Sequence, residues 1–133
     1  MIRTAKAALD IGIVTRNAAA MVDFYHGLLG LPLAGEIRIP GTGRIVRLQC
    51  GDSIIKLFAL DEVPCADRPP GFYLSTSGLR YFTITVGNIR ETIEACRRSG
   101  VGIVTEIVQP RPSVLAAMVA DPDGNTIELM ETV

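Results

Sequence analysis

Four polar side chains are the residues of this chain best suited to chemistry, namely Asp10, Lys56, Tyr81 and Glu128. Together they offer two carboxylates, an ammonium group and a phenol. Such groups form ion pairs, exchange hydrogen bonds with a bound molecule, or transfer protons when their surroundings shift their pKa. Which of these roles applies depends on the elements that carry them.

The four residues occupy corresponding positions in an internal repeat. Residues 9–17, LDIGIVTRN, align without gaps with residues 80–88, RYFTITVGN, so that Asp10 matches Tyr81 at an offset of 71 residues. Residues 52–58, DSIIKLF, align with residues 124–130, GNTIELM, so that Lys56 matches Glu128 at an offset of 72 residues. A repeat of this length indicates one structural unit present twice.

Strand periodicity predicts that the four side chains share one kind of surface. Apolar and polar residues alternate over 9–14 and 81–86, and the same parity applies at 53–59 and 126–131. The apolar set must face a helix-covered core. Asp10, Lys56, Tyr81 and Glu128 are therefore expected on the opposite face of their sheets.

Each half of the chain reads as strand, helix and three strands. We expect the Asn17 and Asn88 side chains to cap the two helices, with Glu91 completing a capping box and the helices ending near Gly30 and Gly100. The remaining strands are predicted at 34–39, 44–50, 103–108 and 114–120. The proline- and glycine-rich residues 61–78 read as a linker between modules at about 7–60 and 79–133 of a single domain, 1–133.

Composition restricts the class of protein. A length of 133 residues with 48% apolar and 20% charged residues suits one globular domain. The net charge of −1, spread along the chain, argues against nucleic acid or an anionic membrane as a partner. No apolar run approaches the roughly 20 residues of a membrane span, and the start does not read as a signal peptide, so a cytoplasmic protein is expected. Three cysteines without a CxxC pair favour reduced thiols.

The chain resembles the vicinal oxygen chelate superfamily, which holds the glyoxalase, bleomycin-resistance, fosfomycin-resistance and extradiol-dioxygenase proteins. The resemblance rests on LDIGIV at 9–14, on Phe24-Tyr25 followed by Leu29-Gly30-Leu31, and above all on DPDGNTIEL at 121–129. It covers almost the whole chain. It implies an α+β fold of two tandem βαβββ modules, whose curled mixed sheets surround one open cavity.

The resemblance also implies where a metal would bind, because the family takes its ligands from the first and fourth strand of each module. Those positions fall on Asp10, Lys56, Tyr81 and Glu128, where the family pattern has His or Gln, Glu, His and Glu in that order. A unit positive charge about 4 Å from a divalent ion, at an effective dielectric constant of about 20, is repelled by about 8 kcal/mol. No metal or other cofactor is therefore expected, unless Lys56 loses its proton and becomes a ligand. The only histidine, His26, is expected on the first helix, away from this face.

A Lys56–Glu128 ion pair could stand in the place of the metal if the two modules meet as in the family. Such a pair could simply neutralise itself and specify the fold. Alternatively, Lys56 or Glu128 could move a proton on a bound carbonyl or enol substrate, with Tyr81 and Asp10 as donor and acceptor. Tyr81 could equally be a wall residue with a polar tip.

Six further residues are candidates for ligand binding. Arg47 and Gln49 could reach an anionic group, although a solvated strand edge explains them as well. Thr83 and Thr85 could hydrogen-bond a ligand. Phe58 and Met130 would supply apolar walls.

Two functions remain open. The first is a metal-independent protein that binds a small, partly aromatic or amphipathic compound in the cavity of a homodimer, as the bleomycin-resistance branch does. The second is a lyase, isomerase or dioxygenase. The altered ligand set favours the first, and neither the ligand nor the pairing of modules, within a chain or across a dimer, can be read from the sequence.

Overall fold

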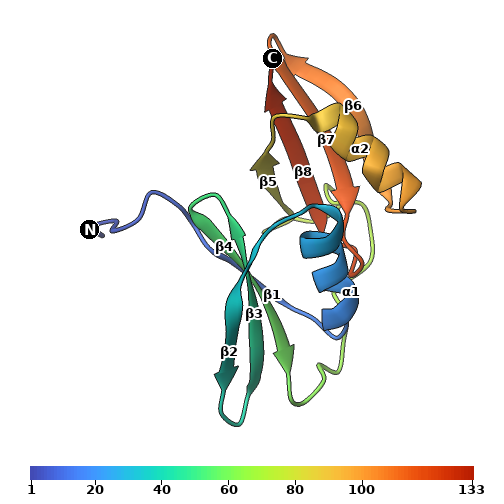
Figure 1. Cartoon of the computed structure of the whole chain (residues 1–133). Coiled ribbons are helices and arrows are strands. Elements are labelled where there is room, and N and C mark those ends of the chain that lie inside the picture. Colours follow the sequence, from blue (N-terminus) through green and yellow to red (C-terminus); the bar gives the residue numbers. More distant parts are fainter. The chain divides into compact units, whose positions relative to one another are not determined.

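The computed structural model describes residues 1–133, and they form two modules of the same design (Figure 1). The first holds β1 (Ile11–Val14), α1 (Ala18–Val22), the π-helix η1 (Asp23–Leu28), β2 (Leu33–Ile39), β3 (Gly43–Cys50) and β4 (Ser53–Leu60). The second holds β5 (Tyr81–Thr85), α2 (Ile89–Arg98), β6 (Ile103–Arg111), β7 (Val114–Ala120) and β8 (Thr126–Thr132). The predicted βαβββ order is therefore present twice.

The chain divides into two compact units, Met1–Asp67 and Arg68–Val133. The boundary falls inside the segment 61–78 that the sequence marks as a linker, which contains turns and bends but no helix or strand. That the two make a single domain stays a prediction.

Both sheets have the same topology. In the first module the strand order is β1-β4-β3-β2, and in the second it is β5-β8-β7-β6. The first strand runs parallel to the fourth in each module, and the other neighbours are antiparallel. Each sheet is mixed and open, with two free edges. The α+β fold class expected from the sequence is confirmed.

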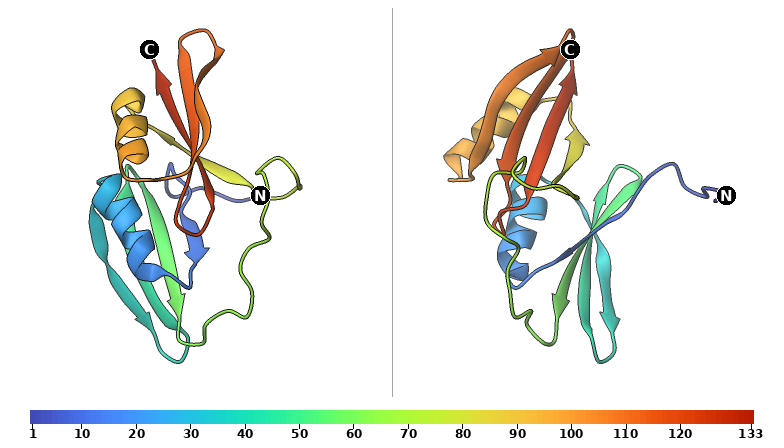
Figure 2. Two further views of the ribbon diagram at one scale, coloured as in Figure 1. Left: turned by 90° about the vertical axis from the view of Figure 1, so that its right-hand side faces the viewer. Right: turned by 180° about the vertical axis from the view of Figure 1, so that it is seen from behind.

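One face of each sheet is covered by its helix (Figure 2). In the first module Met21, Phe24 and Tyr25 are buried on the helical segment, and Leu48 and Leu57 are buried on the strands. In the second, Ile89, Ile93 and Cys96 of α2 are buried with Ile127 and Leu129 of β8. These apolar contacts are the main favourable term of each module, because they remove hydrocarbon surface from water. They also fix which strand residues face away from the helix.

The helical segment of the first module differs from the single α-helix expected up to Gly30. It changes into a π-helix at Asp23, and Leu29 donates its N–H to the Phe24 carbonyl five residues earlier at 2.9 Å. The wider turn places both Phe24 and Tyr25 in the core, with their rings edge to face at 4.8 Å. Packing of two adjacent aromatic residues therefore outweighs regular α-helical spacing here.

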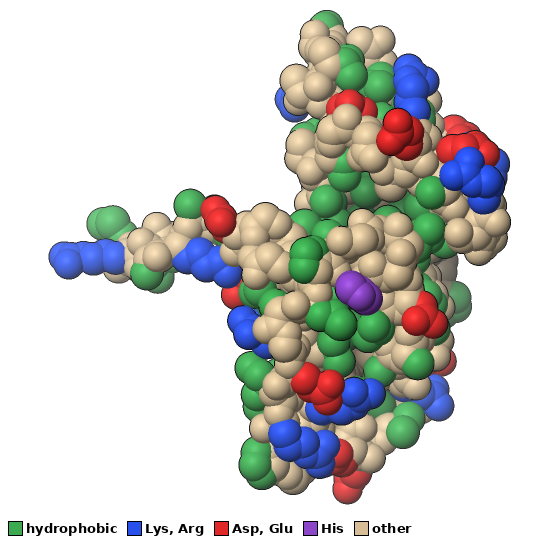
Figure 3. Space-filling model, in the orientation of Figure 1, with side chains coloured by type: hydrophobic (Ala, Val, Ile, Leu, Met, Phe, Trp, Pro, Cys, Tyr) green, Lys and Arg blue, Asp and Glu red, His purple; other side chains and the backbone are tan.

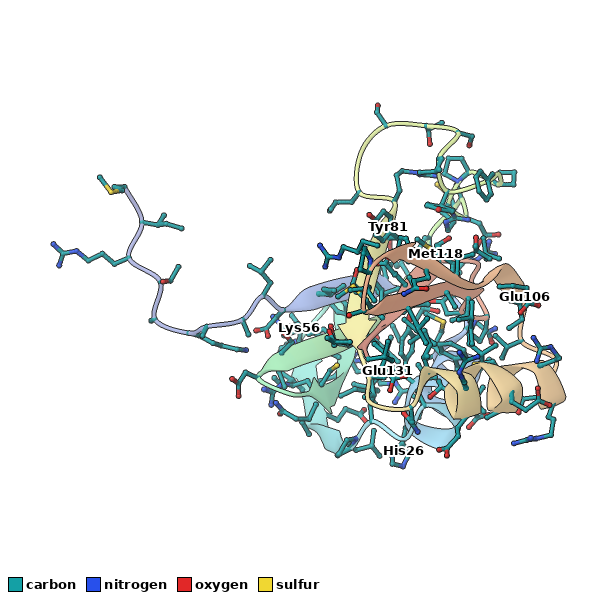
Figure 4. The ribbon with its side chains drawn as sticks, turned by 90° about the horizontal axis from the view of Figure 1, so that it is seen from above. His26, Lys56, Tyr81, Glu106, Met118 and Glu131 are labelled. Atoms are coloured by element: carbon teal, nitrogen blue, oxygen red, sulfur yellow. The ribbon has the colours of Figure 1, made fainter.

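The expected side-chain caps are wrong. Neither Asn17 nor Asn88 caps its helix through its side chain. In α2 the Glu91 carboxylate bonds the Asn88 side-chain amide at 3.3 Å instead of completing a capping box. The N–H of Ile89, at the start of α2, donates to the Glu131 carboxylate of β8 at 2.9 Å (Figure 4). The Glu131 carboxylate thus accepts a hydrogen bond from the helix start, as the Asn88 side chain was expected to do.

The DPDGN segment, the most specific part of the family resemblance, forms the turn into β8. The buried Asp121 carboxylate accepts the N–H groups of Asp123 and Asn125, at 3.0 and 2.8 Å, and the Asn125 side-chain amide at 2.8 Å. Gly124 adopts φ of +82°, a conformation that favours glycine. The motif is therefore structural, and it sets the start of the strand that carries Glu128.

The surface shows basic and acidic side chains interspersed on the face drawn in Figure 3. Within the chain, no helix is long and apolar enough to cross a membrane. His26 is exposed, and its Nδ1 lies 2.8 Å from the carbonyl oxygen of Leu31. Cys50, Cys65 and Cys96 are free thiols, and burial raises the pKa of Cys50 and Cys96.

Candidate functional site

In the first module, Lys56 lies on β4, on the sheet face away from the helix (Figure 4). The register pairs it with Gly12 of β1 on one side and with Arg47 of β3 on the other. Two basic side chains thus stand directly opposite one another on adjacent strands. Both are half-buried. Three predicted residues, Arg47, Lys56 and Phe58, share this face.

The neighbours of this basic pair are apolar or neutral. Phe58 is paired with Ile45, and Gln49 is paired with Ile54. Arg47 donates from Nη1 to the carbonyl of Ala34 at 3.3 Å, while the Gln49 amide bonds the carbonyl oxygens of Gly51 and Ser53. Gln49 is thus committed to the turn between β3 and β4 more than to a ligand.

Asp10 lies just before β1, and its carboxylate already has two partners. Oδ1 accepts the Ile54 N–H of β4 at 2.8 Å and the Lys6 ammonium at 2.6 Å. The hydrogen bond from Lys6 and then that from Ile54, aided by the charges of Lys6 and Lys56, hold the pKa of Asp10 below its ordinary value of 3.8. Asp10 therefore fastens the end of β1 to β4 as an ionised carboxylate.

In the second module, Glu128 lies at the position equivalent to Lys56. Its Oε1 accepts the hydroxyl of Thr83, the residue paired with it on β5, at 2.7 Å. Met130 is paired with Thr85 one step along the same face, and Met118 of β7 is paired with Glu128 on the other side. This face therefore combines one oriented carboxylate with hydroxyl groups and methionine side chains.

Tyr81 begins β5 and is 45% exposed. Its ring meets that of Tyr73 edge to face at 5.7 Å, and Tyr73 in turn contacts Phe72 at 4.7 Å. Arg80 holds the loop in place by donating from Nε to the Tyr73 carbonyl at 3.0 Å. We call Phe72, Tyr73 and Tyr81 the aromatic cluster. This cluster was not predicted from the sequence, although two adjacent aromatic residues, Phe72 and Tyr73, in a linker of mostly small and polar residues are a signal for it.

The structure thus brings the predicted site residues together in two groups, one per module. Lys56, Arg47 and Phe58 share a face in the first, with Asp10 and Gln49 at its border. Tyr81, Thr83, Thr85, Glu128 and Met130 share a face in the second. Lys56 and Glu128 belong to different modules, so their ion pair stays a prediction.

Two surface hollows lie apart from these residues. One of about 450 Å³ adjoins the start of α2 and is lined by Asn88, Glu91 and Glu131 among others. The other, of about 310 Å³, adjoins β2 and includes Leu33, Glu36 and Arg44. Neither is lined by a predicted site residue, and the chain has no group of three or more His, Cys, Asp or Glu side chains that could hold a metal ion.

Two βαβββ modules, each with a parallel pairing of its first and fourth strands and a polar open face, define the class of fold. The chain belongs to the Glyoxalase/Bleomycin resistance protein/Dioxygenase superfamily, whose sequence pattern matches residues 8–129. The resemblance noted from the sequence is confirmed.

Solved structures agree on the fold. A glyoxalase family protein from Bacillus cereus is 21% identical with a TM-score of 0.83, and the match covers 99% of this chain and 97% of that one. The trypanothione-dependent glyoxalase I from Leishmania major is 22% identical with a TM-score of 0.72, covering 96% and 87% of the two chains. A lactoylglutathione lyase from Agrobacterium tumefaciens is 20% identical with a TM-score of 0.66, covering 97% and 96%. None of the curated proteins matches the chain.

Proposed function

We propose that this protein binds a small organic molecule against the open faces of its sheets, without a divalent metal. The observation that carries the proposal is the state of the residues at the family's metal positions. Lys56 places an ammonium there, and Asp10 is already engaged by Lys6 and the β4 backbone.

The donor set does not fit a divalent ion. Transition metals in such sites take imidazole and carboxylate ligands. Of the four positions only Glu128 offers a carboxylate of the usual kind, and that group accepts a hydrogen bond from Thr83. The Tyr81 ring packs on that of Tyr73, and Lys56 would repel the ion. The activities in the names of two related structures, glyoxalase I and lactoylglutathione lyase, are therefore not carried over to this chain.

The remaining side chains suit an organic ligand. Phe58, Met130 and the aromatic cluster offer apolar and stacking surface, while the Thr83 and Thr85 hydroxyls offer a few directional contacts. In this superfamily the two open faces surround one cavity, formed within a chain or across a dimer. A partly aromatic compound bound against such an open face is the kind of ligand we infer.

Backbone amide NMR spectra test this directly. The isotope-labelled protein, kept in a chelator, is titrated with 2-naphthamide, a neutral aromatic probe. We expect shifts at Lys56 and Phe58 in the first module and at Thr83 and Met130 in the second. Shifts confined to other surfaces, or shifts that require added zinc or nickel, would overturn the proposal.

A steric variant provides the matched control. Gly12 stands beside Lys56 in the register, and a side chain built there meets nothing within 4 Å. Gly12→Ile should therefore fold normally, because β-branched residues suit strands, yet project into the open face and abolish binding of the probe. Gly27→Leu, at a helical position that is also free of neighbours, should leave binding unchanged.

A further inference from the structure

We propose that the ligand of this site carries a carboxylate, held by Arg47 and Lys56 of the first module. This inference rests on the proposed function and names the class of molecule that the site accepts. It starts from the row of four residues that the register places side by side across the sheet. These are Gly12 of β1, Lys56 of β4, Arg47 of β3 and Gly35 of β2, called here the cation row.

The cation row concentrates positive charge, and no carboxylate forms an ion pair with it. Like charges directly opposite one another on adjacent strands destabilise a sheet. Neither Arg47 nor Lys56 forms an ion pair, and no acidic residue shares their face in the register of the four strands. Asp10, at the border of the face, lies near enough for the charge of Lys56 to help lower its pKa, but its Oδ1 accepts hydrogen bonds from Lys6 and the Ile54 N–H.

On the other face of the same sheet, an equivalent pair of basic residues is neutralised by carboxylates. Arg38 and Arg44 also stand opposite one another on β2 and β3. Each of them has its own carboxylate, since Arg38 pairs with Asp61 at 2.7 Å and Arg44 pairs with Glu36 at 3.2 Å. The sheet therefore neutralises one pair internally and leaves the cation row open to an anion from outside.

Space is available at the cation row. A side chain built on Gly12 or on Gly35 meets nothing within 4 Å, so both ends of the row are open. Arg47 is anchored through one nitrogen to the Ala34 carbonyl, which leaves its other N–H donors available. A guanidinium fork beside an ammonium suits the two oxygens of a carboxylate. Because both side chains are half-buried, they are less screened than free surface charges.

The body of the ligand is expected to be apolar. Phe58 and Ile45, paired with one another, occupy the next position along the same face. A molecule with its carboxylate on the cation row would lay hydrocarbon or a ring against these two side chains.

Calorimetric titration with a pair of matched probes tests the inference. The probes are 2-naphthoate and 2-naphthamide, which share a ring system and differ in the charge of the head. We expect the carboxylate to bind at least about tenfold more tightly, as charge-assisted hydrogen bonds provide, with a preference that shrinks as salt is added. Lys56→Met and Arg47→Met should each remove the preference, whereas Arg44→Met, on the opposite face of β3, should retain it.

Each outcome bears on a different claim. Equal affinities of the two probes for the wild-type protein would overturn the carboxylate inference and leave the proposed function standing. A preference that survives in both Met variants would overturn the assignment to Arg47 and Lys56. If neither probe binds, the inference and the proposed function fail together. The wild-type comparison needs no variant, so misfolding of a mutant cannot obscure it.

Discussion

Asp10 illustrates how a residue that looks available in the sequence is committed in the structure. Its carboxylate joins the end of β1 to the Ile54 N–H of β4 and to Lys6. Alternation along the strand predicts the face on which it lies, but not these partners. A backbone N–H 44 residues away becomes a neighbour only when the parallel pairing of β1 and β4 forms.

The lowered pKa of Asp10 predicts a pH-dependent contribution to stability. A carboxyl group whose folded-state pKa lies below its unfolded value stabilises the fold above the unfolded value. That contribution is lost as the pH falls through the folded pKa. Asp10→Asn should therefore lower the free energy of unfolding at neutral pH, and the difference from wild type should vanish in acid. Urea titrations across this pH range provide the measurement.

Asp52→Asn is the control for Asp10. It removes an exposed carboxylate that forms no ion pair, in the turn between β3 and β4. We expect little change in the free energy of unfolding. An Asp10→Asn variant as stable as wild type at neutral pH would mean that the contacts with Lys6 and Ile54 do not stabilise the fold.

At the scale of elements, the repeat and the strand parity predict most of the architecture. The strands at 9–14, 53–59, 81–86 and 126–131 are found within a few residues of their expected ends, and the faces of Lys56 and Glu128 follow from alternation. The two helices begin where expected, directly after Asn17 and Asn88, but the side-chain contacts at their starts could not be predicted. The acceptor for α2 is Glu131, which lies 42 residues after Ile89 in the chain and is brought there by sheet formation.

Glu131 should therefore matter more to α2 than Glu91 does. Glu131→Ala leaves the N–H of Ile89 without its acceptor and removes negative charge from the helix start, which should cost about 0.5–2 kcal/mol of unfolding free energy. Glu91→Ala breaks only an exposed side-chain contact with Asn88, and its cost should be smaller. Denaturant unfolding of both variants gives the comparison. Equal losses would show that Glu91 stabilises the start of α2 as much as Glu131 does.

At the scale of the whole molecule, the Lys56–Glu128 ion pair that the family resemblance implies stays a prediction. Removing one partner of a fully buried ion pair costs roughly 3–5 kcal/mol, and less is expected here because both side chains are half-buried. A double-mutant cycle with Lys56→Met and Glu128→Gln measures the coupling, and the double variant should recover part of the loss. Coupling indistinguishable from zero would remove the ion pair from the account.

We also propose a symmetric homodimer. Each sheet has two free edges, and β2 and β6 expose Leu33, Ile37 and Val108 along them. Uncovered edges and apolar side chains promote association, which a symmetric dimer would satisfy. Sedimentation at micromolar concentration should show a dimer. A stable monomer would contradict this proposal and favour a cavity formed within one chain.

The metal content of the purified protein tests the central claim most directly. The claim is that an ammonium, an engaged carboxylate and a packed phenol have replaced the ligand set of the superfamily, so that binding needs no metal. Elemental analysis should find zinc, nickel, manganese and iron far below one equivalent per chain, both as purified and after incubation with each metal and desalting. One equivalent of any of them, retained by the wild-type protein and lost from Glu128→Ala, would contradict the account.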